Sequence, residues 1–541
     1  MNAEMIYKRR WLTLAVLCVS LLVVSLDNTI LNVALPTLVE DLHATASQQQ
    51  WLVDAYTLVF ASLLLTGGAL GDKFGRRGAL MIGLGIFGTG SLFAAFTTSA
   101  WSLIGTRAAM GIGGALIMPA TLSILTNTFT NPKERTKAIG IWAGVSGLGV
   151  AIGPVLGGWL LHHFWWGSVF LINVPVVIAG IVLGYLLVAP TKEHNAPKLD
   201  IVGTAMSFVG LAALIYGIIE APSRGWVSAS IVTAFGLAIV MIGSFVYWEL
   251  HTVNPVLDVR LFRNPRFSGA SIAISLTFFA LFGSIFFITQ YLQFVLGYDA
   301  LAAGIRTAPV ALAIVLGAGV SVPLTNRLGS KIVVTAGLTS VGTGLFILSL
   351  AKVDSGYTIV FATLIILGFG MGMAMTPATD SIMGAVPPEK AGVGSAVNDT
   401  TRELGGVLGV AILGSIAANS YHSNMPEATL RSAGLPPAAA SAAHDSIGGA
   451  VSVARQIGAA AQDLAHTASI HYVTAMSTSV RIGAGFAALG ALVALIWLPA
   501  RATAVPRSES LDGDFGVDLD LDLDAELAGM SADGASELAG D

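Results

Sequence analysis

Residues 67–80 read GGALGDKFGRRGAL, a short polar stretch between two long apolar runs. Its charged residues are Asp72, Lys73, Arg76 and Arg77, and the glycines between them let two helix ends approach closely. Basic residues in a short loop hold that loop on the cytoplasmic side of a membrane. Asp72 can accept hydrogen bonds from a neighbouring helix N-terminus or from a guanidinium group. The stretch predicts a tight cytoplasmic turn between two membrane-spanning helices, although an ordinary positively charged loop explains each charge taken alone.

The composition places the whole chain among membrane proteins. Of its 541 residues, 54% are hydrophobic and only 11% are charged, and the mean hydropathy is +0.77. A soluble domain does not hide so much apolar surface. The formal net charge of −5 misleads, because residues 508–541 hold eleven acidic and no basic residues. The rest of the chain has 21 acidic and 27 basic residues, a formal charge of +6. The acidic tail is expected to be disordered.

Fourteen apolar runs follow one another, each near the roughly 20 residues that cross a bilayer as a helix. They are residues 11–35, 50–70, 79–96, 101–125, 138–161, 168–188, 201–219, 230–248, 267–296, 302–324, 332–350, 357–375, 393–416 and 473–498. The sequence therefore predicts an all-α polytopic membrane protein.

The distribution of Lys and Arg sets the expected orientation. With the N-terminus inside, the cytoplasmic segments hold 19 basic residues, and the external loops hold only Arg224, Lys352, Arg431 and Arg455. This bias and the even number of spans predict that both termini are cytoplasmic. The long gap 417–472 is then external. Its alanine-rich composition suggests a helical hairpin, with a loop without fixed structure as the alternative.

A weak internal repeat predicts two halves. Residues 326–331 (NRLGSK) lie between two spans as residues 72–77 (DKFGRR) do, with Asn in place of the acid. Secondary transporters are often built from such repeats. The expected organisation is a cytoplasmic N-terminus (1–10), a six-helix bundle (11–189), a linker with two extra helices (190–266), a second six-helix bundle (267–499) and a cytoplasmic tail (500–541).

Several kinds of site have no support in the sequence. Cys18 is the only cysteine, so an internal disulfide or a cysteine metal cluster is excluded. His162 and His163 are adjacent and diverge on a helix, and no phosphate-binding loop for ATP is present. We therefore expect neither cofactor nor metal nor enzymatic activity, and a proton gradient as the energy source.

The turn in residues 67–80 resembles the loop between the second and third helices of the major facilitator superfamily of transporters. The residues that carry this resemblance are Gly68, Leu70, Asp72, Lys73, Gly75, Arg76 and Arg77. A second motif, GVSGLGVAIGPVLGGWLL, resembles the fifth-helix signature of the antiporter branch. Its key residues are Gly149, Gly153, Pro154, Gly157 and Gly158. Glycines four apart form a smooth groove and proline bends a helix, so we expect this helix to seal one bundle against the other during gating.

Three further stretches resemble the fourteen-helix drug:proton antiporters. They are LDNTILNVALP (26–36), the segment that contains Arg107 and Gly111, and NDTTRELGGVLGVAILGS (398–415). Met110 stands where a Gln is often found in this family, which is a departure in the local polar network. The resemblance implies the major facilitator fold and export against an inward proton flow. It does not indicate the substrate.

Charged residues within the spans are candidates for proton coupling, because charge at such depth is costly unless it faces a cavity or another charge. At 1.5 Å per residue, Asp27, Arg107 and Asp54 lie roughly 12, 9 and 6 Å below the outer helix ends, where they could meet. Glu403 comes near the midplane, with Asp399 and Arg402 beside it; these last two are as readily a structural ion pair. Asp27, tuned by Arg107, is the first choice for the proton carrier and Glu403 the second.

A substrate pocket is suggested by an aromatic stripe. Phe278, Phe282 and Phe286 repeat every four residues above Gln290 and Gln293, although such a stripe more often packs or faces lipid. We expect a monomeric exporter of hydrophobic, cationic compounds in the plasma membrane, with no nucleic-acid partner. The alternatives are a symporter that imports a small solute, and a transporter-like scaffold or sensor whose acidic tail binds a partner.

Overall fold

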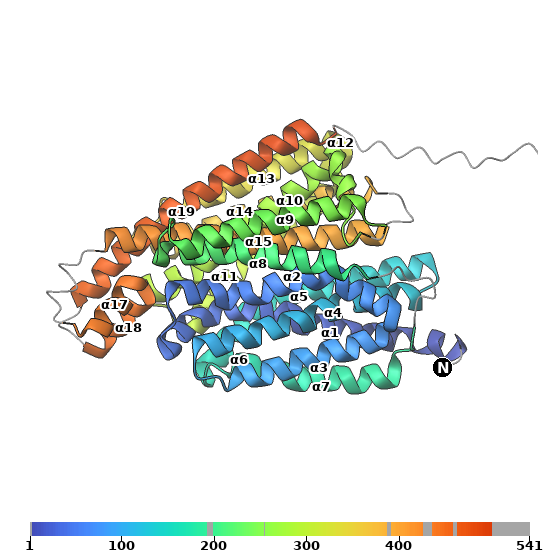
Figure 1. Cartoon of the computed structure of the whole chain (residues 1–541), viewed down its shortest axis with the longest axis horizontal. Helices are drawn as coiled ribbons and strands as arrows, with labels where there is room; N and C mark the ends of the chain where they lie inside the picture. The colour runs from blue at the N-terminus through green and yellow to red at the C-terminus, as the bar shows by residue number, and fades with distance from the viewer. Residues whose placement is uncertain are drawn as a thin grey trace, which may run out of the picture. The chain divides into compact units, whose positions relative to one another are not determined.

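The computed structural model describes residues 3–191, 199–253, 255–386, 391–425, 435–457 and 462–499. Within these ranges the chain forms helices joined by turns and contains no β-strand. This confirms the all-α prediction (Figure 1). The tail 500–541, which was predicted to be disordered, lies outside the described residues.

The amino-terminal half is built around α4, which packs along α2 and α3, while α1 packs along α5 and α7. Residues 3–191 contain α1 (Ala3–Leu42), α2 (Ala46–Phe74), α3 (Arg76–Ala95), α4 (Ala100–Thr128), α5 (Pro132–His163), α6 (Ser168–Leu171) and α7 (Asn173–Leu187). Thr45 begins α2 with a capping box, in which its hydroxyl accepts from the Gln48 N–H and the Gln48 side chain accepts from the Thr45 N–H.

Two helices link the halves, α8 (Ile201–Arg224) and α9 (Ala229–His251). α8 packs against α9 and also against α2 and α15, so it lies along both halves. α9 exposes large apolar side chains such as Val232, Ile239 and Val240. An exposed apolar surface of this kind suits lipid rather than water.

The carboxy-terminal half repeats the pattern of helix pairs, with α14 packed along α12 and α13, and α10 along α15. Its elements are the 3₁₀-helix η1 (Val259–Arg263), α10 (Pro265–Gln290), the π-helix η2 (Tyr291–Val295), α11 (Ala300–Thr307), α12 (Pro309–Leu328), α13 (Ser330–Leu348), α14 (Gly356–Met383), α15 (Ala391–Asn424), α17 (Pro437–Asp445), α18 (Ile447–Ile457) and α19 (Gln462–Trp497).

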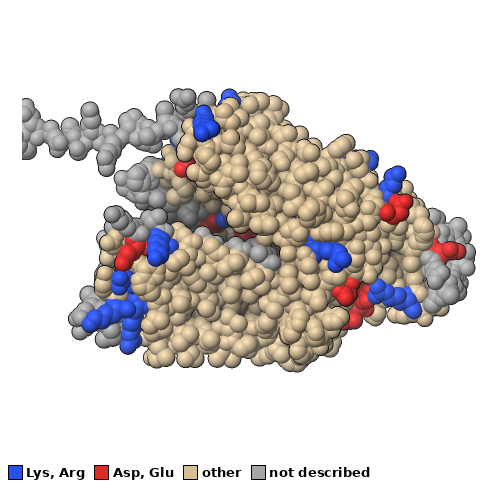
Figure 2. All heavy atoms as spheres, turned by 180° about the vertical axis from the view of Figure 1, so that it is seen from behind, with Lys and Arg blue, Asp and Glu red and all other residues tan. Residues whose placement is uncertain are grey.

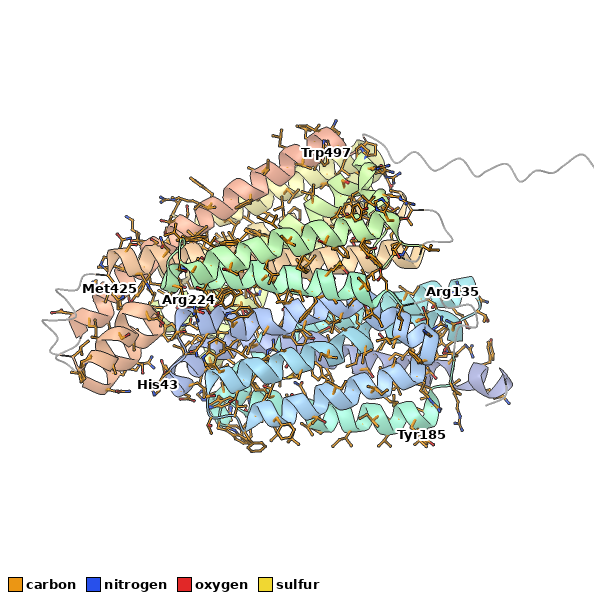
Figure 3. All side chains as sticks on the ribbon, in the orientation of Figure 1. His43, Arg135, Tyr185, Arg224, Met425 and Trp497 are labelled. Atoms are coloured by element: carbon orange, nitrogen blue, oxygen red, sulfur yellow. The ribbon has the colours of Figure 1, made fainter. Side chains whose placement is uncertain are left out.

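The helices run roughly alongside one another, so the body has two ends, which Figure 3 marks by labelled residues. We call the end with His43, Arg224 and Met425 the His43 end. The opposite end, with Arg135, Tyr185 and Trp497, also contains the α2–α3 turn and is called the Gly75 end.

The structure supports thirteen of the fourteen predicted spans as membrane-crossing helices. Among the described residues, thirteen helices or helix pairs are long and apolar enough to cross a membrane. α5, with 32 residues, occupies the one remaining predicted span. The predicted limits were too short at several places: α1 runs on to Leu42 through Pro36, and α19 begins at Gln462 rather than at 473. Hydropathy marks only the part of a helix inside the bilayer, whereas backbone hydrogen bonds continue into the polar region.

The long gap 417–472 contains ordered helices in its described part. α15 extends to Asn424, and α17 and α18 pack against each other as a hairpin at the His43 end (Figure 1). The hairpin alternative is therefore the one that the structure supports. Residues 426–434 and 458–461 of this gap lie outside the described residues.

The internal repeat is visible in the two corresponding turns. Gly75 and Gly329 both have positive φ, 119° and 82°, and each donates its N–H to the carbonyl four residues earlier at 2.9 Å. Side chains rarely adopt this backbone conformation, so glycine is needed at both positions. The two turns thus have the same local structure, as expected for a duplicated unit.

Candidate functional site

The α2–α3 turn forms the tight polar structure that its sequence predicts. Asp72 accepts from the guanidinium of Arg76 at 2.7 Å and from the Ser123 hydroxyl of α4 at 3.4 Å. The Arg76 N–H donates to the carbonyl of Thr191 at 3.0 Å. The neighbouring Arg77 donates to the carbonyl of Val188 at 3.2 Å. The turn therefore joins α2, α3 and α4 to the segment that follows α7.

The remaining residues of this motif either allow close helix packing or lie at the Gly75 end of the protein. A side chain at Gly68 would touch Pro119 of α4, with Cβ atoms 3.4 Å apart. Lys73 lies over the ring of Phe74 at 5.4 Å. Both observations fit a helix pair that approaches closely at the Gly75 end.

Asp27 and Arg107 form a buried ion pair in the amino-terminal half. Asp27 is 2% exposed and Arg107 1%. Arg107 also donates to the carbonyl of Leu52 at 3.2 Å and lies 4.5 Å from the ring centre of Tyr56. The depth estimate from sequence therefore brought together the correct pair of side chains.

Three uncharged residues of this cluster, Asn173, Ser91 and Tyr56, were not predicted from the sequence. Asn173 of α7 donates to Asp27 at 3.2 Å and lies 3.1 Å from the hydroxyl of Ser91 on α3. Tyr56 of α2 is fully buried, and its hydroxyl has no hydrogen-bond partner among the described residues. An Asn inside an apolar run is the one signal that pointed to this network.

Asp54 does not join the ion pair, contrary to the sequence expectation that it could meet Asp27 and Arg107. It is fully buried, and neither carboxylate oxygen has a hydrogen-bond partner among the described residues. Its neighbours one turn away on the same face show where it lies. Gln50 stands against Gly414 of α15, and Leu58 packs with Val407 of α15. Asp54 therefore faces the other half of the protein.

The carboxy-terminal half holds a second group of charges on α15. Asp399 and Arg402 form an ion pair of 3.4 Å, and both are partly exposed. Glu403 makes no ion pair with any described residue, and its Oε2 atom is buried without a hydrogen-bond partner. Among the deep acidic residues named from the sequence, Asp54 and Glu403 are thus the two that form no ion pair with a described residue.

The aromatic stripe of α10 faces the protein interior rather than lipid. Phe278 and Phe282 stack at 6.2 Å; Arg402 lies 4.9 Å from the Phe278 ring centre, and Phe282 packs on Gly406. Phe286 is buried, with Gln290 hydrogen-bonded to its carbonyl. The Gln293 side chain donates to the carbonyl of Val33 on α1 at 3.0 Å. The stripe therefore adjoins the charged group of α15 and the boundary between the halves.

The glycines of α5 do not all face the other half, which corrects the sequence interpretation. A Cβ atom at Gly149 or Gly153 would overlap Ser25 or Thr29 of α1, and one at Gly157 would meet Ile30. These three glycines let two helices of the same half pack closely. Only the last glycine of the motif and the preceding proline reach the other half: Gly158 lies against Ala300 and Leu301, and the Pro154 carbonyl against Gly304.

The halves touch at the His43 end and separate towards the Gly75 end. The contacts at the His43 end run between α5 and α11 and between α2 and α15, as at Gly158 and Gly414. Figure 2 shows a hollow between the halves that opens towards the Gly75 end, with acidic and basic side chains inside. The structure is therefore closed at one end and open at the other.

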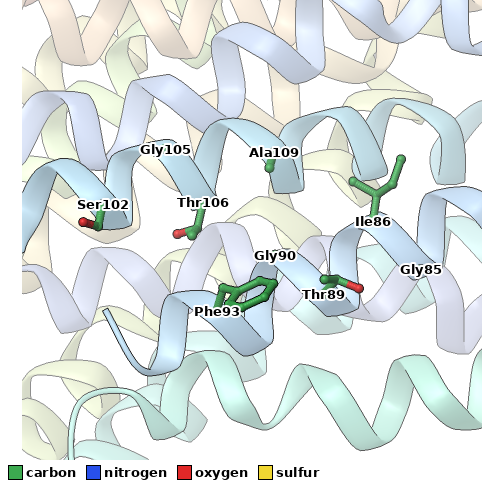
Figure 4. Close-up of a pocket in the computed structure, with 9 residues that line it drawn as sticks. All are labelled: Gly85, Ile86, Thr89, Gly90, Phe93, Ser102, Gly105, Thr106 and Ala109. Carbon is green, nitrogen blue, oxygen red and sulfur yellow. The ribbon is translucent and has the colours of Figure 1, made fainter. Parts of the chain in front are cut away.

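A shallow pocket between α3 and α4 is separate from these charges. Glycines such as Gly85 and Gly105 form its floor, and Thr89, Phe93 and Thr106 edge it (Figure 4). It lies on the surface of the amino-terminal half, and none of the candidate coupling residues lines it.

Paired helices in two halves, membrane-length spans and charges buried between them define a polytopic membrane transporter fold. A bacterial homologue of the human lysosomal transporter Spinster, solved in an inward-facing and unoccupied conformation, has this fold. It aligns with a TM-score of 0.63 and 19% identity over 90% of this chain and 98% of that one. The chain belongs to the Major Facilitator Superfamily, whose sequence profile matches residues 17–410.

Two relatives narrow the comparison within that family. The multidrug efflux pump LfrA of Mycolicibacterium smegmatis is 39% identical over 84% of this chain and 89% of its own length. The methyl viologen resistance protein SmvA of Salmonella typhimurium is 34% identical over 83% of this chain and 90% of its own length. Both similarities extend over both halves of the fold.

Proposed function

We propose that this protein is a proton-coupled antiporter that exports hydrophobic, cationic compounds by alternating access. The observation that carries this proposal is the similarity to LfrA and SmvA, a multidrug efflux pump and a methyl viologen resistance protein, over more than four fifths of the chain. The unpaired carboxyl groups inside the membrane body supply the chemistry that proton coupling needs. An importing symporter is not favoured by either relative.

The ion pair of Asp27 and Arg107 is the proposed coupling element. A proton on Asp27 removes its attraction for Arg107, which then keeps only the carbonyl of Leu52 and the ring of Tyr56. Because Asp27 lies on α1, whereas Leu52 and Tyr56 lie on α2 and Arg107 on α4, making and breaking the pair changes how α1, α2 and α4 hold one another. Proton uptake on one side can in this way favour one conformation, and proton release on the other side the opposite one.

The proposed orientation follows from the basic residues. The Gly75 end, with Lys73, Arg76 and Arg77, faces the cytoplasm, and the His43 end with its α17–α18 hairpin faces outwards. Both termini are then cytoplasmic, in the plasma membrane. A monomer contains all elements of this mechanism, and the proton gradient replaces a cofactor.

Transport in inverted membrane vesicles tests the function. Vesicles with the protein are expected to accumulate ethidium when their lumen is made acidic, and to stop when the gradient is collapsed. Uptake in the opposite direction would support the importing alternative. Drug resistance that disappears on deleting residues 508–541, with vesicle transport intact, would instead favour a partner-binding role for the tail.

Substitution of Glu403 by Gln is expected to impair cationic substrates more than neutral ones. If all six deep groups are ionised, the two ion pairs cancel four charges, and Asp54 and Glu403 carry the remaining formal charge of −2. Low-dielectric walls strengthen the attraction of such charges for cations. We expect about a tenfold loss for a cationic dye, equal to about 1.4 kcal/mol, and about twofold for a matched neutral dye. Equal losses for both dyes would reject this electrostatic account.

A further inference from the structure

A small cavity lies at the His43 end, where helices of both halves meet the α17–α18 hairpin. Its volume is about 40 Å³. A water molecule needs about 10–15 Å³ of such space and two to four polar partners, so the cavity has room for roughly three waters. Its polar lining residues are Gln49, Gln50, Gln290, Tyr421, Asp445, Ser446 and Tyr472.

Gln50 is the lining residue that most needs a partner. It is 1% exposed, and its Oε1 atom has no hydrogen-bond donor among the described residues. A buried amide oxygen without a donor costs free energy, which a bound water recovers. The Gln50 side chain rests against Gly414, at the boundary between the halves.

Asp54 lies one helical turn deeper than Gln50, about 6 Å along α2 on the same face. Leu58, one further turn on, packs with Val407 and Ala411 of α15 and with Ile215 of α8. Apolar packing therefore closes the path beyond Asp54. Both carboxylate oxygens of Asp54 lack a hydrogen-bond partner among the described residues, so Asp54 is an available acceptor on the side of Gln50.

Asp445 forms the other wall of the cavity. Its carboxylate accepts from the N–H of Ala46 at 2.9 Å and lies 3.2 Å from the His422 imidazole. Four further titratable groups line or adjoin this region: Tyr421 of α15, Tyr472 of α19, Glu220 of α8 and His444 of α17, whose ring centre lies 5.2 Å from that of His422. The Tyr421 and Tyr472 hydroxyls donate to backbone carbonyls, and Glu220 accepts from Ser47, Trp51 and Arg224. Glu403 of α15 lies deeper, beyond Val407.

We propose that this cavity holds the water that delivers protons from Asp445 and His422, past Gln50, to Asp54. In each transfer one O–H bond forms on the Asp54 carboxylate and one breaks on the adjacent water. That water regains its proton along the chain from the Asp445–His422 pair. This route deepens the proposed function and rests on it for its direction, since it makes the His43 end the side of proton entry.

Hydrogen–deuterium exchange at the Asp54 carboxyl group, followed by infrared spectroscopy, tests the route. The purified full-length chain in lipid is expected to show a protonated carboxyl band that Asp54→Asn removes. Gln50→Leu keeps the side-chain volume but loses the water-binding amide, and Ala417→Leu fills the cavity. Both are expected to slow exchange of that band about tenfold.

Thr363→Val is the matched control. Thr363 of α14 is equally buried, its hydroxyl has no partner among the described residues, and it does not line the cavity. Its exchange rate is expected to equal that of the unaltered chain. Unchanged exchange in both Gln50→Leu and Ala417→Leu, or a carboxyl band that survives Asp54→Asn, would overturn the route.

The measurement needs neither drug nor gradient, so it separates the route from the function. Slow exchange in both variants of a chain that exports nothing would support the route and reject the exporter. Gradient-driven export with unchanged exchange in both variants would reject the route alone.

Discussion

Asp27→Asn is expected to reduce proton-driven dye export at least a hundredfold, to about the background of empty vesicles. Asn has nearly the same shape and still offers an oxygen to the Asn173 amide, but it cannot bind a proton at neutral pH. It also leaves Arg107 without a counter-charge in a fully buried position. The change thus removes the proposed proton carrier and the partner that it controls.

Loss of the buried partner also costs stability, about 3–5 kcal/mol for a pair of this kind. The Leu52 carbonyl and the Tyr56 ring remain for Arg107, so we expect the variant to insert and fold. Expression level and thermal stability in detergent check this. Asp27→Glu, which keeps a carboxyl group, is the conservative control and is expected to retain measurable export. Undiminished efflux by Asp27→Asn would remove Asp27 from the coupling mechanism.

Gly158→Leu is expected to abolish transport for a different reason, by preventing closure at the His43 end. A Cβ atom at this position would come within 2.5 Å of the Ala300 carbonyl oxygen and 2.6 Å of the Leu301 Cα atom. Both are backbone atoms of the other half and cannot rotate away. The variant is expected to remain open at the His43 end, so that it cannot take up dye from the cytoplasmic side.

The conformational effect can be read from cysteine labelling, because the single native Cys18 is buried. A cysteine introduced at Ala417, which is buried and lines the small cavity at the His43 end, is expected to react with a maleimide much faster in Gly158→Leu. Gly236→Leu on α9 is the matched control, since no atom lies within 4 Å of its new Cβ. Normal export together with slow labelling in Gly158→Leu would show that this contact does not close the protein.

The sequence predicted how deep each buried charge lies along its helix better than it predicted which neighbouring helix the side chain faces. Asp27 and Arg107 meet as the depth estimate suggested, whereas Asp54 at a similar depth faces the other half. Residue spacing measures distance along a helix, but the rotation of α2 depends on its packing against α4. There Gly67, Gly111 and Gly114 allow close contact with backbone and aromatic rings. A pattern of glycines predicts that a helix can pack closely against another helix, but it does not identify that helix.

The same limit applies to α5 and to the aromatic stripe. The α5 motif correctly indicated close packing, but three of its glycines serve α1 of the same half. Phe278 and Phe282 have an apolar character that suits lipid equally well, and only the position of α15 shows that they lie beside Arg402 and Gly406. Such assignments depend on contacts between residues more than a hundred positions apart, which local periodicity does not contain.

The smooth face of α5 extends beyond the contact that now holds the halves together. Gly140 and Gly158 are eighteen residues apart, five full helical turns, so they point in the same direction about 27 Å from each other. Gly158 is in contact with the other half, while a side chain at Gly140 would meet no atom within 4 Å. A helix that has glycine at both ends of one face can contact a neighbouring helix at either end. Moving between the two contacts does not require side chains to repack. We therefore expect α5 to contact the other half near Gly158 in the present conformation and near Gly140 when the protein opens in the opposite direction.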